Sequence, residues 1–465
     1  MTRLQRMLPL VATASLLAAC SQFQPYQRPV VPVPGAWEGS VPSAAGMAAS
    51  PTSWQALVKD PALRALLEKA LANNRDARVA ALQVAQVRAQ YQIRDAARWP
   101  TVNAGVTGSR QTVGENEPVK SAYSAGLQVS GWEIDFFGRL ESLKEAALAQ
   151  YLATEEARKN VHISLVAAVT SGWLNLQASD ALLALTQQTL ASRDEALRLT
   201  RLRFDNGVAS ALEWRQAQSL AESARVTLVQ QQRQRALDRN ALLLLIGQPV
   251  DHALSDADLR SEGPAGTAAL QAVSDVPVGL PSSVLLDRPD IRAAEQQLAA
   301  ANAQVGAARA AFFPRIALTA SLGSASSELS GLFKSGTWGW ALAPQALLPI
   351  WDAGANQAGF DSAQAGRDLA VAQYEKAIQV AFKEVNDALV TRTTLEAQIG
   401  AQQALEAAET ERLRLSELRL SQGVANQLEV LDAQRSLFSA QQALLQLRFA
   451  LAQSRVALFK ATAGL

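Results

Sequence analysis

The chain has little of the chemistry that catalytic and metal sites need. Its 465 residues include one cysteine, Cys20, and two histidines, His162 and His252. A single cysteine excludes an intramolecular disulfide, and the two histidines do not have the spacing of metal ligands. Glycine-rich phosphate loops and nucleophile-elbow motifs are also absent from the sequence. The sequence therefore predicts a protein that is not an enzyme and that binds no cofactor or metal.

Long hydrophobic runs are missing as well. After residue 19, no segment has 18 consecutive apolar residues, so the sequence predicts no transmembrane helix. Residues 1–19 carry Arg3 and Arg6 before a short apolar run, a pattern typical of a secretory signal peptide. The run ends in Leu17-Ala18-Ala19-Cys20, which is a lipobox. We therefore expect Cys20 to be acylated and to anchor the mature chain in lipid. Ser21 follows the cysteine, and resemblance to bacterial lipoproteins without aspartate at this position implies sorting to the outer membrane.

Proline is concentrated in one segment, and net charge is low. Residues 20–54 are rich in proline, serine, alanine and glycine, and we interpret them as an extended lipidated tether. Loss of the two arginines of the signal peptide lowers the formal net charge from +1 to about −1. A chain with so little charge has no strong attraction to nucleic acid, and none is expected as a partner.

What the chain does contain is a duplicated unit. Residues 195–218 and 411–434 align at an offset of 216 residues, and 13 of the 24 positions are identical. A match of this density at one spacing indicates a repeat. Upstream, Trp99-Pro100 and Phe313-Pro314 end two similar stretches rich in alanine and glutamine. Each copy is predicted to read helix, strand, strand, very long helix, turn and helix.

The predicted long helices cover about 139–204 and 354–420. Neither contains proline, and good helix formers dominate both. A helix of this length, roughly 100 Å, needs a lateral partner. Apolar residues at heptad-like spacing indicate coiled-coil packing. Two pairs of shorter helical segments have the combined length to serve as partners: 75–98 with 210–246, and 290–312 with 426–462. Gly207 and Gly423 are predicted to reverse the chain at the tips of two helical hairpins.

Four segments alternate small or polar residues with apolar ones. They are residues 101–107, 123–130, 316–322 and 338–343. A soluble sheet with one wet face would give this pattern, and so would a barrel wall between lipid and water. Four strands do not close a barrel, and open edges do not occur in lipid, so a membrane wall requires several chains. The loops 108–121 and 324–336 would then lie on the outside.

The whole pattern resembles the TolC-like outer-membrane factor family of tripartite efflux pumps, and most of all its lipidated multidrug-efflux subgroup. The most specific segments are residues 286–291, 311–314 and 423–437. The resemblance implies a mainly α fold with a membrane β-barrel. Three chains would form a twelve-stranded β-barrel and a coiled-coil α-barrel, with a belt near residues 55–73, 247–287 and the C-terminal end. It also implies two protein partners, a periplasmic adaptor and an inner-membrane RND-type transporter.

The resemblance also implies a gate at the hairpin tips. Acidic residues just past each tip ring the periplasmic aperture in the family, and they align with Glu213, Glu429 and Asp432. Crowded carboxylates would favour cations and would raise one another's pKa. The subgroup often adds a ring of leucine, for which Leu420 and Leu431 are the candidates. Solvated charges on a helix face are the alternative interpretation.

The tips themselves would meet the adaptor. The residues that the resemblance assigns to the tips and to adaptor docking are Arg203, Gly207, Val208, Arg419, Gly423 and Val424. Simple packing within each hairpin is the alternative interpretation of these residues.

These expectations give a domain plan and a function. The plan is a signal peptide (1–19), a tether (20–54), a first repeat (55–248) with strands at about 101–134, an equatorial linker (249–287) and a second repeat (288–465) with strands at about 315–350. The expected function is the outer-membrane channel of a tripartite efflux pump, which passively conducts drugs or other small toxic solutes. A metal-ion efflux channel, a type I secretion channel and a non-conducting periplasmic lipoprotein are the alternatives.

Overall fold

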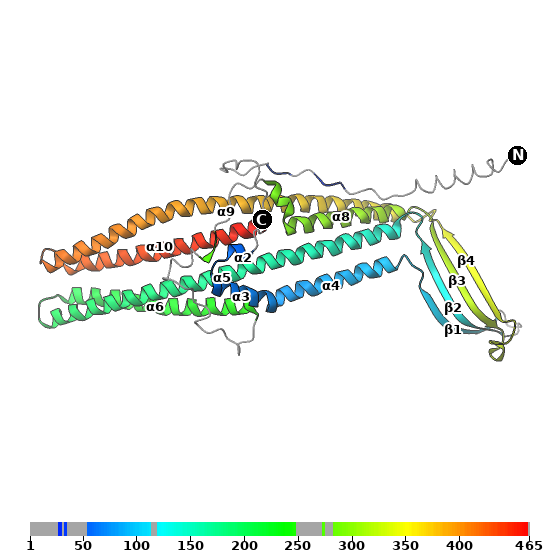
Figure 1. Cartoon of the computed structure of the whole chain (residues 1–465), viewed down its shortest axis with the longest axis horizontal. Helices are drawn as coiled ribbons and strands as arrows, with labels where there is room; N and C mark the ends of the chain where they lie inside the picture. Colours follow the sequence, from blue (N-terminus) through cyan, green and yellow to red (C-terminus); the bar gives the residue numbers. More distant parts are fainter. Residues whose placement is uncertain are drawn as a thin grey trace. The chain divides into compact units, whose positions relative to one another are not determined.

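The computed structural model describes residues 27–29, 32–34, 54–112, 119–247, 272–274 and 282–463. The signal peptide, Cys20 and His252 lie outside these residues, as does most of the predicted linker. In chain order the described elements are α2 (Trp54–Leu57), α3 (Pro61–Asn73), α4 (Arg75–Ala96), β1 (Val102–Gln111), β2 (Lys120–Ile134), α5 (Arg139–Asp205), α6 (Ala211–Ile246), η2 (Ser282–Asp287), α8 (Pro289–Ala310), β3 (Arg315–Ser326), η3 (Leu329–Gly331), β4 (Trp338–Leu347), α9 (Ala355–Ser421) and α10 (Gln427–Ala461) (Figure 1).

The two copies of the repeat have the predicted order of elements. Helix, two strands, very long helix and helix follow one another in each copy. The long helices α5 and α9 both have 67 residues, and their first residues are 216 positions apart. The chain is therefore mainly helical with one small sheet, and the duplication read from the sequence extends to the length of its longest elements.

Each long helix begins at an aspartate that caps it. Asp135 accepts hydrogen bonds from the backbone N–H of Arg139 at 2.7 Å and of Glu141 at 2.8 Å. Asp352 accepts from Gly354 at 3.0 Å and from Asn356 at 2.9 Å. A carboxylate at this position satisfies N–H groups that have no partner inside the helix, and it opposes the positive end of the helix dipole. The starts of α5 and α9 are thus fixed locally by the sequence.

The chain forms two compact units. One is drawn from the described residues within 82–156 and 292–376, together with residues 27–29, and it contains the sheet. The other is drawn from those within 32–81, 157–291 and 377–463, and it contains both hairpin turns. In this second unit Trp173, Leu174 and Leu242 are completely buried. None of the helices in the described ranges combines the length and the apolar character that a membrane span requires.

The predicted belt segments meet within the second unit. Val58 and Val273 form an antiparallel bridge, and the Lys59 N–H donates to the Ala272 carbonyl at 2.8 Å. Arg455 of α10 donates to the Val273 carbonyl at 3.3 Å. The described parts of 55–73, of 247–287 and of the C-terminal helix are therefore joined by direct hydrogen bonds.

The sheet is antiparallel, with strand order β1-β2-β3-β4. Its strands run further than the alternation predicts. β1 continues to Gln111, β2 starts at Lys120, and β3 continues to Ser326, so residues 108–111, 120–121 and 324–326 are strand and not loop. Cross-strand pairing extends the strands through residues whose own pattern is weak, because each pair adds ladder hydrogen bonds whatever the side chain.

The register gives the sheet two different faces. One face carries glycines, hydroxyls and amides: Asn103, Gly105, Thr107, Ser124, Gly126, Gln128, Ser321, Gly323, Gly339 and Ala341. The other carries Val102, Ala104, Val106, Tyr123, Ala125, Leu127, Ala320, Leu322, Trp338, Trp340 and Leu342. Val106 is 74% exposed and Trp340 is 77% exposed, so the described residues leave these side chains of the apolar face uncovered.

Four glycines lie in one register row across the sheet. Gly105 pairs with Gly126, Gly126 with Gly323, and Gly323 with Gly339. A β-carbon on Gly126 would lie 2.3 Å from the carbonyl oxygen of Leu322, and one on Gly323 would lie 2.3 Å from that of Ala125. β2 and β3 therefore approach each other at a distance that only glycine permits.

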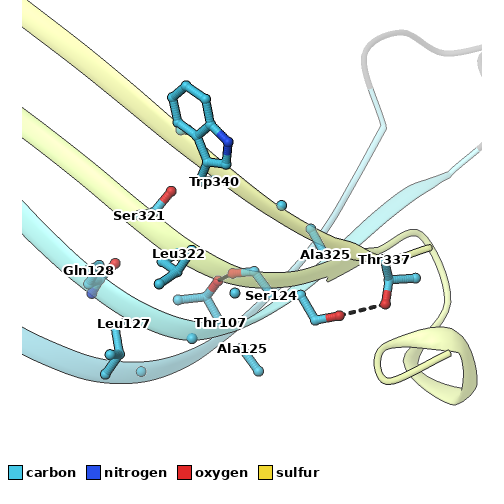
Figure 2. Close-up of a pocket in the computed structure, with 16 residues that line it drawn as sticks. Thr107, Ser124, Ala125, Leu127, Gln128, Ser321, Leu322, Ala325, Thr337 and Trp340 are labelled. Atoms are coloured by element: carbon cyan, nitrogen blue, oxygen red, sulfur yellow. Dashed lines mark hydrogen bonds between the residues drawn. The ribbon is translucent and has the colours of Figure 1, made fainter. Parts of the chain in front are cut away.

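The glycine row leaves a hollow of about 270 Å³ beside it. Figure 2 shows the hollow and labels Thr107, Ser124 and Thr337 among its lining residues. The Thr107 hydroxyl is bonded to that of Ser124 at 2.6 Å, and the Ser324 hydroxyl is bonded to that of Thr337 at 2.5 Å. The sheet thus combines a bare glycine strip with flanking hydroxyl groups.

Candidate functional site

The first hairpin turns between α5 and α6. Gly207 has φ of +72°, and the Val208 N–H donates to the Arg203 carbonyl at 2.8 Å. A glycine in the left-handed region, followed by a bond back to the last helical turn, is the usual way to close a helix C-terminus. The positive φ predicted at Gly207 is therefore confirmed.

α6 begins with a complete capping box. The Ser210 hydroxyl accepts from the Glu213 N–H at 3.2 Å, and the Glu213 carboxylate accepts from the Ser210 N–H at 2.7 Å. Both bonds satisfy N–H groups at the start of the helix. The Glu213 carboxylate is thereby directed to its own backbone.

Aromatic contacts clasp this first tip. Phe204 and Trp214 stack with ring centroids 5.4 Å apart. Arg201 lies over the Trp214 ring at 4.3 Å, and Arg215 lies over it at 4.1 Å. Stacking and cation–π contacts of this kind each contribute roughly 0.5–1.5 kcal/mol. Trp214 therefore ties the end of α5 to the start of α6.

The second hairpin turns in the same way between α9 and α10. Gly423 has φ of +72°, and the Val424 N–H donates to the Arg419 carbonyl at 2.9 Å. Asn426 caps α10 by accepting from the Glu429 N–H at 3.1 Å. The positive φ predicted at Gly423 is confirmed as well, so the backbone of the two tips is the same.

The second tip is clasped by charges. Glu429 accepts from Arg419 at 3.0 Å across the turn. Asp432 is bonded to Arg412 of α9, and it accepts from Arg435 at 2.5 Å. All of these side chains are partly exposed, so each pair contributes modestly to stability. Two arginines thus flank the one carboxylate that the sequence singles out most strongly.

These contacts change the electrostatics expected of the acidic residues. The hydrogen bond from Arg412, and then the positive charges of Arg435 and Arg412, lower the pKa of Asp432 below its ordinary value. This direction is opposite to the increase that crowding by like charges would cause. Within one chain, then, two arginines balance the charge of Asp432. Crowding of the Asp432 carboxylates of three copies around a threefold axis stays a prediction.

The two candidate gate leucines lie in different surroundings. Leu431 is 6% exposed, so its side chain is buried inside the chain. Leu420 is half-buried at the end of α9. Leu420 is therefore the leucine of this pair that retains exposed side-chain surface in the single chain.

The residues assigned to docking are at the surface. Val208 is 67% exposed and Val424 is 68% exposed, and each follows its glycine directly. Arg203 is also exposed. Arg419 is exposed but is engaged by Glu429. Each tip thus presents one valine at the apex, which is an apolar contact point on an otherwise polar turn.

Sequence reasoning missed three residues that organise the tips. Arg412 and Arg435 hold Asp432, and Trp214 holds the first turn. The alignment of the two copies carries part of the signal, because Trp214 stands opposite Val430 and Arg412 opposite Ala196. Among the described residues, no group of three or more His, Cys, Asp or Glu side chains is arranged to hold a metal ion.

The described residues thus form a duplicated helix–strand–strand–helix–helix unit with a two-faced sheet and capped hairpin tips. A profile of the family described as outer membrane efflux protein matches residues 66–248 and 280–464. The chain belongs to this family.

Curated relatives and solved structures agree with this assignment. The chain is 45% identical to the toluene efflux pump outer membrane protein TtgC and to the antibiotic efflux pump outer membrane protein ArpC, both of Pseudomonas putida, over 98% of this chain and 95% of each relative. The open state of the MtrE outer membrane channel of Neisseria gonorrhoeae superposes with a TM-score of 0.85 at 37% identity, covering 96% of this chain and 98% of that one. This protein is thus an outer-membrane efflux protein.

Proposed function

We propose that three copies of this chain form one channel, which passively conducts small toxic solutes from the periplasmic side to the exterior. The observation that carries the proposal is the sheet. Its apolar face is uncovered, and in the described chain β1 and β4 each have one edge without a partner. Edges of this kind are not tolerated in lipid, whereas three sheets joined edge to edge make a closed wall of twelve strands.

The solute path follows from the other face of the sheet. That face carries hydroxyls, amides and glycines, and among its described strand residues it has no charged side chain between Asn103 and Thr107 or between Ser124 and Gln128. Such a wall does not select strongly among solutes. We propose that this channel carries a broad set of apolar and amphipathic compounds, as the toluene and antibiotic pumps of its relatives do, and that the inner-membrane pump selects them.

The gate is proposed at the second hairpin tip. Leu420 would supply the apolar constriction, and Glu429 and Asp432 the polar one. Because both carboxylates are already paired with arginines, the closed aperture would be held by ion pairs and not by repulsion. Glu213 would act indirectly, by holding the first turn through its capping box, and Leu431 would support α10 from inside the hairpin.

The partners are proposed to bind at the two tips. Val208 and Val424 are exposed apolar residues of the two turns, as Leu212 and Leu428 are at the helix starts that follow. Arg203 and Arg419 flank the valines at the end of each long helix. Gly207 and Gly423 add no side chain of their own beside these valines. A periplasmic adaptor with helical hairpins of its own fits this surface, and it would connect the channel to an inner-membrane transporter of the RND type.

The lipid on Cys20 and the tether 20–54 would anchor each copy, and the linker 249–287 would complete the belt between the two repeats.

Two neighbouring residues on opposite faces of β4 test the channel. Leu342 lies on the apolar face and Ala341 on the small-residue face. A lysine on the lipid side of a barrel costs roughly 2–4 kcal/mol near the bilayer centre. Leu342→Lys should therefore abolish stable trimers in detergent. Ala341→Lys should leave trimers intact and lower the cation conductance in planar bilayers.

Three results would contradict parts of this proposal. If the parent protein is a monomer by native mass spectrometry, or forms no conducting pore, the channel proposal fails. Equal behaviour of the two lysine variants would show that the two faces do not separate lipid from water. Cys20→Ser should remove acylation and leave the pore conducting, and palmitate labelling that persists in this variant would contradict the lipid anchor.

A further inference from the structure

The first repeat contains a groove with a strongly positive lining. It lies in the second compact unit between the start of α4 and the middle of α5, and it has a volume of about 860 Å³. Arg75, Arg78 and Ala81 line it from α4, and Arg158, Lys159 and His162 line it from α5. None of the lining residues that the structure describes is acidic. Arg158 and Lys159 also have partners within the chain, whereas the two arginines of α4 add positive charge to a lining without acidic residues, which is complementary to an anion.

The charges on α4 are available for a ligand. Arg75 and Arg78 are exposed, and in the described part of the chain neither guanidinium group makes a hydrogen bond or an ion pair. His162 contributes no charge near neutral pH, because burial and then the charge of Arg158 lower its pKa below the ordinary value. The positive character of the groove therefore comes from arginine and lysine.

The second repeat shows that the helical architecture does not require this lining. α5 and α9 correspond at an offset of 216 residues, and α4 and α8 at an offset of 214. At these offsets Arg158 corresponds to Tyr374, Lys159 to Glu375 and His162 to Ile378, while Ala81 corresponds to Glu295. Tyr374 and Ile378 are completely buried. Of the four basic residues only Arg78 has a basic counterpart, Arg292, so the cluster of four is particular to the first repeat.

In the second repeat the corresponding place holds a segment of extended chain. Arg28 donates from Nε to Glu295 Oε1 at 2.6 Å and from Nη2 to Oε2 at 2.5 Å. Burial, and then the nearby Glu295 carboxylate, raise the pKa of the Tyr374 hydroxyl, which marks Tyr374 as a neighbour of this pair. A carboxylate on the second repeat therefore receives a basic residue from the segment 27–29. In the first repeat Ala81 stands at the position of Glu295, and the reversed charge is that of Lys159, which corresponds to Glu375.

We propose that the groove lined by Arg75, Arg78, Arg158 and Lys159 binds an extended acidic peptide segment of a periplasmic partner protein. The geometry would repeat that of residues 27–29 on α8, with acid and base exchanged between groove and ligand. The groove is separate from both hairpin tips, so this contact is independent of the proposed gate and adaptor surface.

The test uses the full detergent-extracted protein and a labelled, capped octapeptide of alternating glutamate and alanine. Binding is measured by fluorescence anisotropy at low salt, beside a matched peptide with lysine in place of glutamate. Arg75→Gln with Arg78→Gln should weaken binding by about tenfold, as expected for the loss of two exposed charge pairs. Ala81→Glu, which introduces the acid of the second repeat, should weaken it to a similar extent.

A matched control lies on the same helix. Arg88→Gln with Arg94→Gln removes the same charge from exposed positions of α4 that do not line the groove, and it should change binding by less than about twofold. Binding that falls equally in this control would reduce the effect to net charge and overturn the proposal. So would equal binding of the lysine peptide, or full displacement by pyrophosphate at concentrations similar to those of the peptide. Binding that appears only after Asp256 and Asp258 are changed to asparagine would assign the groove to the chain's own acidic segment, and would also overturn it.

Discussion

The turn after α5 and the turn after α9 close their helices with the same backbone and hold them with different chemistry. Both glycines have φ of +72°, and both are followed by an exposed valine. At the first tip, Trp214 is stacked on Phe204 and covered by two arginines. At the second tip, Val430 replaces the tryptophan and is buried, and ion pairs to Glu429 and Asp432 replace the aromatic contacts.

The two tips differ in how easily a change of salt or a partner can break their contacts. Ring stacking such as that of Phe204 on Trp214 does not depend on pH or salt, whereas exposed ion pairs weaken as salt screens them. Glu213 and Glu429 illustrate the point, because they occupy the same position of the repeat. Glu213 completes a capping box, whereas Glu429 accepts a hydrogen bond from Arg419 across its turn. The second hairpin is therefore the one suited to respond to a partner or to ions.

The largest effect is expected at Asp432. Asp432→Ala removes three carboxylates from a trimer, leaves Arg435 without this partner and leaves Arg412 paired with Glu409 alone. The aperture then carries excess positive charge, so the cation-to-anion permeability ratio should fall at least about threefold. Reversal potentials in a salt gradient across a planar bilayer measure this ratio. Gln216→Ala is the control at the same position of the first repeat, and an equal change there would contradict a special role of the second tip.

A smaller effect is expected from replacing the aromatic clasp. Trp214→Val places the residue of the second tip into the first, and it removes one stacking contact and two cation–π contacts. The local opening free energy of the first tip should drop by about 1–3 kcal/mol. Hydrogen exchange of residues 198–215 measures the change, and residues 414–431 of the same sample serve as the internal reference. Unchanged protection of the first tip would mean that Trp214 does not hold it.

The two glycines should respond alike. A β-carbon at Gly207 or at Gly423 would meet nothing within 4 Å, so the cost of alanine is that of the left-handed backbone alone. That cost is about 1–2 kcal/mol at each site. Gly207→Ala and Gly423→Ala should therefore increase hydrogen exchange at their own tips by similar factors. A much larger effect at one tip would reveal a contact there that the single chain does not have, such as one with a neighbouring copy.

The smallest change is expected from pH. The pKa of Asp432 is lowered in the folded chain, so its ion pair contributes stability above the ordinary aspartate pKa and loses it only as pH falls through the lowered value. Ion selectivity should therefore stay constant between about pH 5 and 8. Selectivity that titrates inside this range, and loses the titration in Asp432→Ala, would show that crowding between copies outweighs the arginines.

The helix boundaries were predictable because residues next to each boundary determine it. Asp135 and Asp352 cap α5 and α9, and Gly207 and Gly423 end them, so one short stretch of sequence determines each boundary. The outer ends of the strands were not predictable in the same way. Residues 108–111 and 324–326 carry glycine, serine and arginine, and only their partners on β2 and beyond make them strand.

The candidate site was predictable in its positions and not in its contacts. The family resemblance points to Glu429 and Asp432, but one of the two partners of Asp432, Arg412, is 20 residues away on the other helix of the hairpin. Which arginine reaches it depends on how the two helices pack, and the sequence pattern of either helix alone does not specify that. For the same reason the burial of Leu431 and the exposure of Leu420 are properties of the folded hairpin.

The glycine row in the sheet has a genetic consequence. Gly126 and Gly323 each occupy the space that a β-carbon on the other would need, and the obstructing atoms are backbone. A loss-of-function alanine at either position therefore has no compensating partner, because no residue is smaller than the glycine opposite. Selection for restored function should return true revertants, or suppressors that shift the strands themselves. The irregularity of β2 between Val129 and Trp132, where the pairing with β3 already slips, is where such suppressors should collect.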